Sequence, residues 1–519
     1  MPTECSPTLF EFAPAAGRAV VAGFDGGAIT SDAGALLLGA TDRAIGLVTR
    51  FATCFADARD PDRIEHAIAT LVGQRVFGIA LGYEDLIDHD QLRRDPALAI
   101  LAGKLAARRA ACAPLAGKST LNRLERAPAG GPGRYHRIGH DGTAIEALFV
   151  DLFLDAHRSA PRQIILDLDA TDVPLHGHQE GRFFHGYYDA YCSLPLYVFC
   201  GRHLLAAKLR RSDIDASAGA VEEVARVVGR IRARWPRLRI LLRADSGFAR
   251  EALMAWCEAN RVDFVFGLAR NPRLVEELAI DLAWAEDDAI RTGQPARRYK
   301  DFRWSTLDSW SRRRRVVGKA EWTRGEANPR FVVTSLKPRE CDARSLYERI
   351  YCARGDMEDR VKECQLDLFA GRASAATMRA NQLRLWFAAM AYVLLSSCSA
   401  RCGASASPTP SSPRPPAARY AWPSSRSARW SGSASAASKW PWPRRIRTKT
   451  SSPSPTRDWP PPRRPDEPDS ASRHRPRQRR PARGDGAVRL QHVQSAGPHA
   501  TMPRTPHRQR PAPTKPGPW

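Results

Sequence analysis

The chain has 519 residues, enough for two or three domains with sizeable cores, and a formal net charge of +25. It has no run of 18 apolar residues and no basic start followed by an apolar stretch, so we expect neither a membrane-spanning helix nor a signal peptide. The 11 cysteines include no CxxC pair, which argues against the usual zinc and redox spacings and favours reduced thiols in a cytoplasm. No GxxxxGK[ST] motif is present, so we expect no nucleotide cofactor.

The positive charge is concentrated in the C-terminal part of the chain. Residues 398–519 hold 24 of the 80 Lys and Arg residues but only 5 of the 55 Asp and Glu residues, which leaves 56 basic and 50 acidic residues, a net +6, for residues 1–397. The same stretch holds 24 of the 40 prolines and has no helical or strand periodicity. We expect this tail to be disordered, because it cannot bury enough apolar surface to offset its chain entropy.

The tail has two interpretations. Arg-rich disordered segments bind nucleic acid by releasing counterions from its phosphates. Alternatively, Pro, Arg, Ser, Ala and Trp are the residues that a GC-rich gene yields in a wrong frame, and plausible codons for Ser438–Trp459 spell an ordinary globular sequence when the frame is shifted. We favour a frameshift near residue 398.

Residues 1–150 are mainly helical in pattern, as in the apolar spacing of Ile64–Val72. A short basic amphipathic stretch, KSTLNRLER, begins at Lys118. If it is the DNA-contacting helix of a helix-turn-helix unit, Lys118, Arg123 and Arg126 contact DNA. The alternative is an ordinary solvated helix face.

Residues 160–397 alternate strands with helices, which predicts a mixed α/β sheet covered by helices. Apolar runs predict strands at Gln163–Leu168, within Tyr187–Cys200, and at Leu204–Leu209, Leu238–Ala244 and Phe264–Leu268. Amphipathic patterns predict helices at Ala144–His157, Val221–Ala233, Arg250–Ala259, Ser345–Phe369 and Ser374–Ser397.

Residues from about 285 to 335 differ from the rest because they are rich in Arg, Trp and Thr, with short β-like runs such as Arg330–Leu336. They predict a β-rich insertion. Its Trp304, Trp310 and Trp322 form a small core or stack on an unpaired base.

The first acidic group, DLDATD at 167–172, ends a predicted strand. Because strand side chains alternate, Asp167 and Asp169 share one face, and Asp172 lies close by. Neighbouring carboxylates repel unless a cation binds between them. Taken alone, a solvated strand end or a helix cap is the better explanation for them.

Two further acids stand at comparable positions. Asp245 follows the apolar strand ILLRA, where α/β sheets place their chemistry, although it would also cap the following helix. Glu358 lies between Arg354 and Lys362 at helical spacing, which by itself indicates a surface ladder of ion pairs. Together with Asp169, these acids are able to hold two Mg²⁺ or Mn²⁺ ions for an in-line phosphoryl displacement.

At these residues the chain resembles a bacterial insertion-sequence transposase of the IS-thirteen-eighty family, within the IS-four-like DDE group. The resemblance covers about residues 1–397. It is carried by DLDATD at 167–172, GRFFHGYYDAYCSLPLYVFCGRHLLAAKLRRS at 181–212, LRADSGF at 242–248 and YCARGDMEDRVKE at 351–363.

The resemblance implies a particular fold and a metal triad. The fold is an RNase H-like catalytic core with a β-rich insertion, after a mainly helical domain that binds DNA ends and before the tail at 398–519. The triad is Asp169, Asp245 and Glu358, with Asp167 and Asp172 as rivals for the first acid. The spacing of 113 residues from the second acid to the third leaves room for the insertion.

The resemblance also implies supporting residues and partners. Tyr351, Arg354 and Glu358 match a Tyr-x-x-Arg-x-x-x-Glu signature that ends in Lys seven residues after the Glu, but here Gln365 holds that place. Lys362 is the substitute we expect for the phosphate contact. The implied partners are double-stranded DNA, at the terminal inverted repeats and the target, and a second copy of the chain in a homodimer.

Other basic and His residues near the first acids have competing roles. Arg210 and Arg211 after the third strand either meet DNA phosphates or form a solvated strand end. His176, His178 and His185 either ligate zinc or line a polar loop, and we favour the loop.

The sequence therefore predicts a cytoplasmic, nucleoid-associated transposase that performs Mg²⁺-dependent cleavage and strand transfer. Two alternatives remain. One is a frameshifted, inactive remnant that binds DNA without cutting it. The other is an RNase H-like metal-dependent nuclease that cuts without joining.

Overall fold

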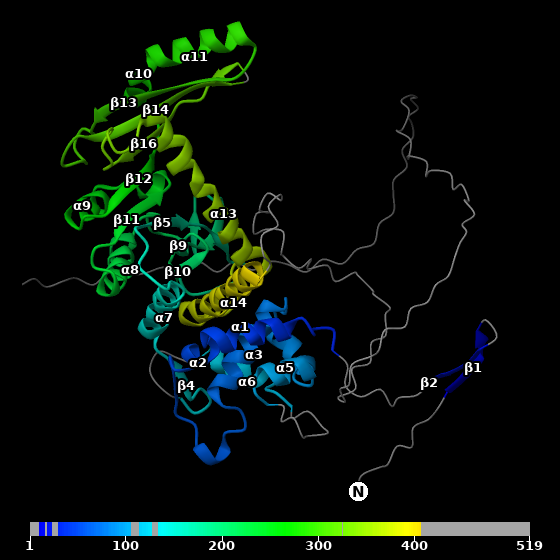
Figure 1. Cartoon of the computed structure of the whole chain (residues 1–519). Helices are drawn as coiled ribbons and strands as arrows, with labels where there is room; N and C mark the ends of the chain where they lie inside the picture. Colours follow the sequence, from blue (N-terminus) through cyan, green and yellow to red (C-terminus); the bar gives the residue numbers. More distant parts are fainter. Residues whose placement is uncertain are drawn as a thin grey trace, which may run out of the picture. The chain divides into compact units, whose positions relative to one another are not determined.

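The computed structural model describes residues 10–15, 18–22, 30–104, 114–126, 133–323 and 325–405 (Figure 1). The expected disorder and frameshift of the tail concern residues that, beyond 405, lie outside this described part. Near the start of the chain, β1 (Phe10–Ala15) and β2 (Arg18–Ala22) pair as an antiparallel hairpin.

A nine-stranded mixed sheet forms the centre of the fold, in the order β10-β9-β5-β11-β12-β16-β14-β13, with β15 paired to β14. The strands β5, β11 and β12 are parallel to one another, and the remaining pairs are antiparallel. Their bounds are β5 (Gln163–Ala170), β9 (Leu196–Cys200), β10 (His203–Lys208), β11 (Arg239–Ala244), β12 (Asp263–Leu268), β13 (Ala296–Trp304), β14 (Arg314–Thr323), β15 (Glu326–Ala327) and β16 (Arg330–Thr334).

One face of this sheet is covered by α7 (Gly142–Asp155), α8 (Ala220–Arg234) and α9 (Glu251–Ala259). Leu166, Leu168 and Leu242 point into this layer. Helix α8 begins with acidic and ends with basic residues, which complements the helix dipole. The expected side-chain alternation in β5 is confirmed, because Asp167 and Asp169 are left on the opposite face.

That opposite face is covered by the C-terminal helices. Residues 346–351 pack on Leu241 and Val265, and α13 (Gly355–Lys362) follows them. The long helix α14 (Met378–Ser405) packs on β10 and on the N-terminal helices.

The N-terminal helices share one hydrophobic core with α13 and α14. They are α1 (Ala35–Ile45), α2 (Leu47–Ala52), α3 (Ile68–Ala80), α4 (His89–Leu92), α5 (Pro96–Leu101) and α6 (Lys118–Glu125), with a two-stranded sheet of β3 (Phe55–Asp57) and β4 (Ile138–His140). Within this core Glu125 is fully buried and bridges Arg75 of α3 and Arg384 of α14, each at 2.8 Å. A mainly helical N-terminal part was expected, and the shared core was not.

Helix α14 is long and apolar enough to cross a membrane by length and composition alone. In this protein 56% of its most apolar window is buried, and residues such as Phe387 and Leu394 lie inside the shared core. A buried core helix meets the same criterion.

The insertion differs from its prediction in two ways. It begins with α10 (Pro272–Glu277) and α11 (Ala279–Thr292), so it is partly helical. Its strands also do not form a separate β unit, because β16 pairs with β12 and thereby extends the central sheet. Trp304 and Trp310 pack edge to face at 5.3 Å, as expected for a small core.

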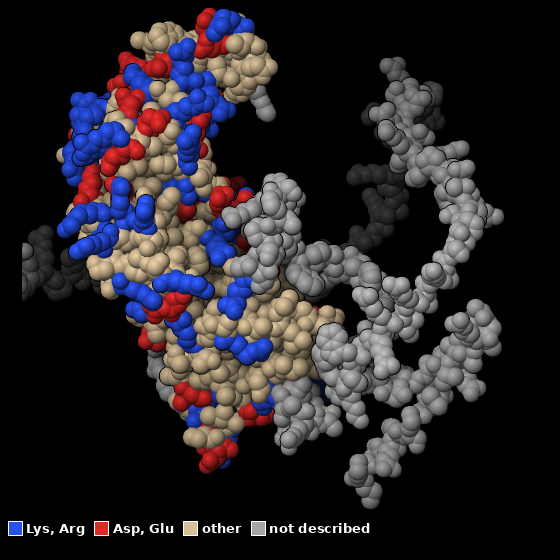
Figure 2. All heavy atoms as spheres, viewed as in Figure 1, with Lys and Arg blue, Asp and Glu red and all other residues tan. Residues whose placement is uncertain are grey.

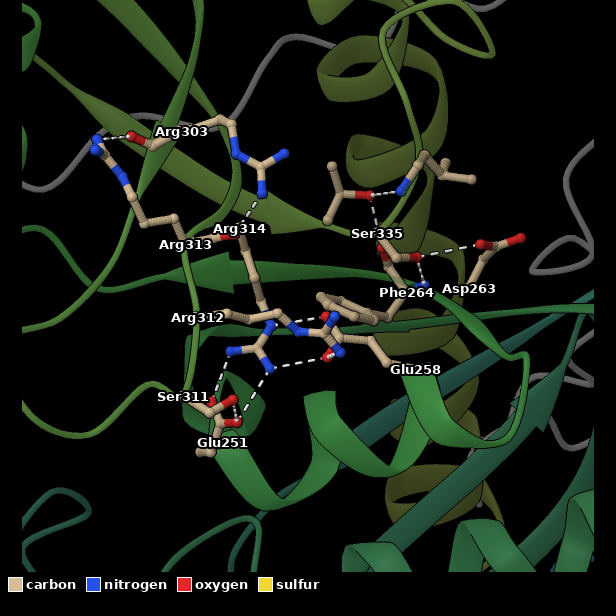
Figure 3. A network of polar contacts seen from close by, with 12 residues as sticks. Glu251, Glu258, Asp263, Phe264, Arg303, Ser311, Arg312, Arg313, Arg314 and Ser335 are labelled. Atoms are coloured by element: carbon tan, nitrogen blue, oxygen red, sulfur yellow. Dashed lines mark hydrogen bonds and ion pairs between the residues drawn. The ribbon is translucent and has the colours of Figure 1, made fainter.

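A buried arginine fastens the insertion to α9 (Figure 3). The Arg314 guanidinium, 2% exposed, donates to Glu251 at 2.6 Å and to Glu258 at 2.9 Å, two helical turns apart along α9. Ser311 and Arg312 bind the same two carboxylates from the loop before β14. The insertion is thereby held against the helix that follows Asp245.

Candidate active site

Asp169 and Asp245 lie at the ends of neighbouring parallel strands. The register pairs Asp167 with Arg243 and Leu168 with Ala244, so the next positions along β5 and β11 are Asp169 and Asp245. The carboxyl ends of parallel strands are the edge at which α/β proteins place their ligands. The two acids predicted from separate motifs therefore meet at one edge and on one face.

Asp245 occupies the turn that ends β11. Its Oδ1 accepts a hydrogen bond from the Gly247 N–H at 2.9 Å and so caps the 3₁₀ turn Ser246–Phe248. The predicted capping role is thus confirmed, but it uses only this one oxygen, which leaves the second oxygen for other partners. The cap fixes the direction of the carboxylate at the sheet edge.

Glu358 approaches from α13 on the same face. The expected single helix over 345–369 is interrupted: α12 (Ala343–Ser345) leads into π-helical turns at Leu346–Tyr351 and a 3₁₀ turn at Cys352–Arg354, and α13 is followed by π-helical turns at Glu363–Asp367. Such turns are frequent at functional sites. Met357 and Val361 form the buried side of α13.

Arg354 joins the first and third acids. Its guanidinium lies 3.3 Å from Asp169 Oδ2 and 2.5 Å from Glu358 Oε1. The side chain is largely buried, whereas Glu358 is about half exposed. Arg354 and Glu358, expected to belong to a ladder of surface ion pairs, therefore link α13 to Asp169 in the acid site.

The electrostatics of Asp169 indicate crowded negative charge. Burial raises the pKa of its carboxyl to about 6, Arg354 opposes that rise, and the charges of Asp245 and Glu358 add to it. All three predicted acids thus lie close enough to influence one proton. Perturbed carboxylates of this kind cluster at functional sites.

Asp167 is bound elsewhere on the same face. Both of its oxygens accept hydrogen bonds from Arg243, at 2.6 and 2.8 Å, and both side chains are almost fully buried. The Arg243 guanidinium also donates to the carbonyls of Ile350 and Ala353, just before α13. With its oxygens engaged in this pair, Asp167 is a poorer candidate for the first acid than Asp169.

Tyr351 packs against the strand end that carries Asp245. A Cβ placed on Gly267 of β12 would lie 2.5 Å from the Tyr351 hydroxyl and 2.8 Å from the Ser246 nitrogen. Only glycine leaves room there for the tyrosine ring. Tyr351 therefore supports the site, as a packing residue beside Asp245.

Lys362 and Gln365 lie further along the chain, at the last residue of α13 and in the π-helical turns that follow it. Lys362 is solvent-exposed and pairs loosely with Asp359 at 3.6 Å. Gln365, in the place of the signature Lys, donates to the Asp172 carbonyl at 3.0 Å. Gln365 thus ties the end of α13 to the loop after β5.

Arg210 does not face solvent, which corrects its expected contact with DNA. It is buried, and its guanidinium donates to the carbonyls of Leu194, Ala216 and Ala218. Arg211 is exposed and pairs with Asp213 at 2.5 Å.

The basic stretch at Lys118 forms α6 as predicted, with Arg123 and Arg126 exposed and Lys118 paired to Asp90. Figure 2 shows that Lys and Arg are also numerous over α9 and the ends of β13 and β14, interleaved with Asp and Glu. Contact with DNA at α6 stays a prediction.

The carboxylate oxygens of Asp169, Asp245 and Glu358 suit a hard divalent cation. Burial is the main cause of the raised pKa of Asp169, and a bound cation would also offset the smaller effect of the Asp245 and Glu358 charges. Within the described ranges, however, no three His, Cys, Asp or Glu side chains are spaced to share a metal ion, and Arg354 lies between two of the acids. This also leaves the zinc hypothesis for the histidines at 176, 178 and 185 without support.

Sequence patterns missed Arg243 and Gly267. A charged residue inside the apolar run ILLRA signals a buried partner, but the partner is known only once the strand register is known. Gly267 stands inside the apolar strand DFVFGL, where glycine marks a close approach of another group.

Carboxylates gathered at the edge of a mixed sheet define the class of the protein as an α/β protein with a candidate active site at the strand ends. The family follows from comparison with known proteins: the model of transposase DDE domain group 1 matches residues 12–407, and the chain belongs to that family. Among curated proteins none matches. A solved structure, described as the piggyBac transposase synaptic complex with hairpin DNA, is a distant match at 11% identity and a TM-score of 0.34. The match covers 71% of this chain and 76% of that one.

Proposed function

We propose that this DDE-family protein is a DNA transposase of the IS-thirteen-eighty type that cleaves the ends of its element and joins them to target DNA. The observation that carries the proposal is the convergence of Asp169, Asp245 and Glu358 from three separate segments. An RNase H-like core is the fold we assign to the central sheet on the basis of this arrangement.

The three acids are the residues that would hold divalent cations, Mg²⁺ or Mn²⁺, in two adjoining positions. When bound, such cations activate the attacking oxygen and stabilise the leaving oxygen of a phosphodiester. The protein's own contribution is positioning: Gly247 fixes Asp245, and Arg354 holds Asp169 and Glu358 at one place. Arg354 is also the cation best placed to bind a non-bridging phosphate oxygen.

In this proposal the N-terminal helices bind the terminal inverted repeats through Lys118, Arg123 and Arg126. Arg211 is the exposed candidate for a phosphate contact beside the acids. Two copies of the chain pair the two ends of the element.

The test is cleavage of plasmid DNA that carries the element's own ends, with Mg²⁺ present. We expect cleavage by the unaltered chain and more than a hundredfold loss in Asp245→Ala and in Glu358→Ala. Asp359→Ala is the matched control, because Asp359 is an exposed acid on the same helix turn. Cleavage that survives both site substitutions contradicts the proposal.

The two other candidates are separated by the same assay. End binding by the unaltered chain without any cleavage favours the inactive remnant, and a one-base correction near codon 398 that opens a globular continuation would support it. Cleavage without joined products favours the nuclease.

A further inference from the structure

A small sheet follows the first acid directly in sequence. Strand β6 (Val173–Pro174) pairs with β8 (Ala190–Ser193), and β8 pairs with β7 (Phe183–His185). A four-residue loop, 186–189, joins β7 to β8, and the Tyr188 N–H closes it on the His185 carbonyl at 3.1 Å. Asp189 takes the left-handed conformation, φ 50°, that this residue type tolerates.

The tip of this hairpin reaches the acid site. The Tyr188 hydroxyl donates to the carbonyl of Ala170, the residue after Asp169, at 3.4 Å. Burial, and then the charges of Asp172 and Asp169, raise the pKa of Tyr188 to about 12, so the hydroxyl is protonated at neutral pH and able to donate this hydrogen bond. One tyrosine of the tip is therefore directed toward the acids.

The rings beside it are directed into solvent. Tyr187 is 86% exposed, Phe184 53% and Tyr191 44%. Phe184 and Tyr191 lie edge to face at 5.5 Å, and Tyr187 and Tyr188 do so at 5.0 Å. Single exposed rings are ordinary, but three within eight residues form a patch that indicates a binding partner.

An arginine stacks on one of these rings and has no ion pair among the described residues. The Arg182 guanidinium lies 3.6 Å from the centroid of Tyr191, and among the described residues its side chain makes no hydrogen bond or ion pair. Arg211, which forms an isolated bridge with Ser193 after the end of β10, lies 4.5 Å from the ring of Phe183. Exposed aromatic faces with cations between them are complementary to a polyanion that carries flat, apolar bases.

The hairpin is fixed at several points, so it offers a preformed surface. Ser212 Oγ donates to the Phe183 carbonyl at 2.9 Å. The preceding loop is tied to the start of α14, because the Glu180 N–H donates to Ala376 and the Glu180 carboxylate accepts from the Met378 N–H, at 2.8 and 2.9 Å. A preformed surface binds without the entropic cost of ordering a loop.

We propose that the hairpin β7–β8 is a stacking platform for unpaired DNA bases next to the acids. Tyr187, Phe184 and Tyr191 receive the base faces, and Arg182 meets the backbone phosphates. Stacking tolerates any base, so the platform reads unpaired structure and not sequence. This inference rests on the proposed function, in which a DNA strand passes the acids.

The test is binding of a short single-stranded oligonucleotide that contains 2-aminopurine to the full-length chain in EDTA. Elevated salt suppresses the counterion-release contribution of the basic tail and leaves stacking measurable. We expect Tyr187→Ala to weaken single-strand binding by roughly 5- to 100-fold and to reduce 2-aminopurine quenching. Tyr187→Trp keeps a ring and should retain both.

Trp284→Ala is the matched control, because Trp284 of α11 is an exposed ring that, like Tyr191, carries an arginine over its face, here Arg298 of β13. It does not belong to this hairpin. The Trp284→Ala variant should leave single-strand affinity unchanged, and Tyr187→Ala should leave duplex affinity unchanged. Equal losses for duplex and single strand, or no loss at all, overturn the platform. A change in oligomeric state without a change in DNA binding also overturns it and assigns the patch to a second copy of this chain.

The binding assay needs no chemistry, so it separates the two proposals. If single-strand binding depends on Tyr187 while cleavage survives Asp245→Ala, the platform stands and the proposed function fails. If single-strand binding does not depend on Tyr187 while cleavage requires Asp245, the proposed function stands and the platform fails.

Discussion

The buried pair of Arg243 and Asp167 gives the sharpest test of how the site is held together. Arg243 joins three segments, because it lies on β11, binds Asp167 of β5 and donates to the carbonyls before α13. Asp169, Asp245 and Glu358 belong to these same three segments. Arg243→Met removes every one of these contacts while keeping much of the apolar volume.

The magnitude follows from burial. Arg243→Met leaves the Asp167 charge buried and unpaired, which costs about 3–5 kcal/mol of unfolding free energy. Asp167→Leu should cost a similar amount, because it leaves the Arg243 guanidinium buried without a counter-charge. In the double variant neither charge remains, so that penalty disappears, but two carbonyls still lack their donor, at about 1–3 kcal/mol. We therefore expect a coupling energy of about 3 kcal/mol or more between the two positions.

The assay is urea unfolding of the four proteins, followed by circular dichroism and linear extrapolation. Arg243→Lys serves as a milder variant, because it keeps the charge and loses the two-pronged geometry. Single effects that simply add, with a coupling below about 0.5 kcal/mol, would refute the buried pair. Additive losses would also return Asp167 to equal standing with Asp169 as the first acid.

Three further results are expected. Because the pKa of Asp169 is raised, the folded state keeps a proton between about pH 4 and about pH 6 that the unfolded state has released, so the metal-free protein loses stability as pH rises through that window. Asp169→Asn should therefore be more stable than the parent at pH 7, by at most about 3 kcal/mol of unfolding free energy. At pH 4 the two proteins should be equally stable in urea unfolding. Glu125→Gln leaves Arg75 and Arg384 without a counter-charge in the core and should cost about 3–5 kcal/mol, seen as a clear fall in Tm, so an unchanged Tm contradicts the buried bridge. Removing residues 406–519, which carry 23 basic and 5 acidic residues, should flatten the dependence of non-specific DNA affinity on salt, and an unchanged slope would exclude the tail as a DNA contact.

Local sequence patterns predicted the elements that are apolar or amphipathic along their own length. The strands near Gln163, Leu238 and Phe264 and the helix over Val221–Ala233 are confirmed within one or two residues at most ends. These elements are specified by their own periodicity, which needs no knowledge of the neighbours.

The features that failed to be predicted depend on pairing between distant segments. The insertion's β16 joins the central sheet only because β12 presents a free edge, and nothing in Arg330–Leu336 specifies that partner. Arg210 stands at a strand end, where sequence favours solvent, yet its guanidinium donates to the carbonyls of Leu194, Ala216 and Ala218. The convergence of the acids was predictable, because motif spacing and strand ends both indicated it.

The shared core around α14 has a practical consequence for dissecting the protein. A fragment starting at residue 160 would keep the acids but leave the side of α14 that now meets α1 and α3 bare to water. Such a piece is prone to self-association in place of folding. Attempts to separate the acid site from the N-terminal helices should therefore work by point substitution, with both parts left in one polypeptide.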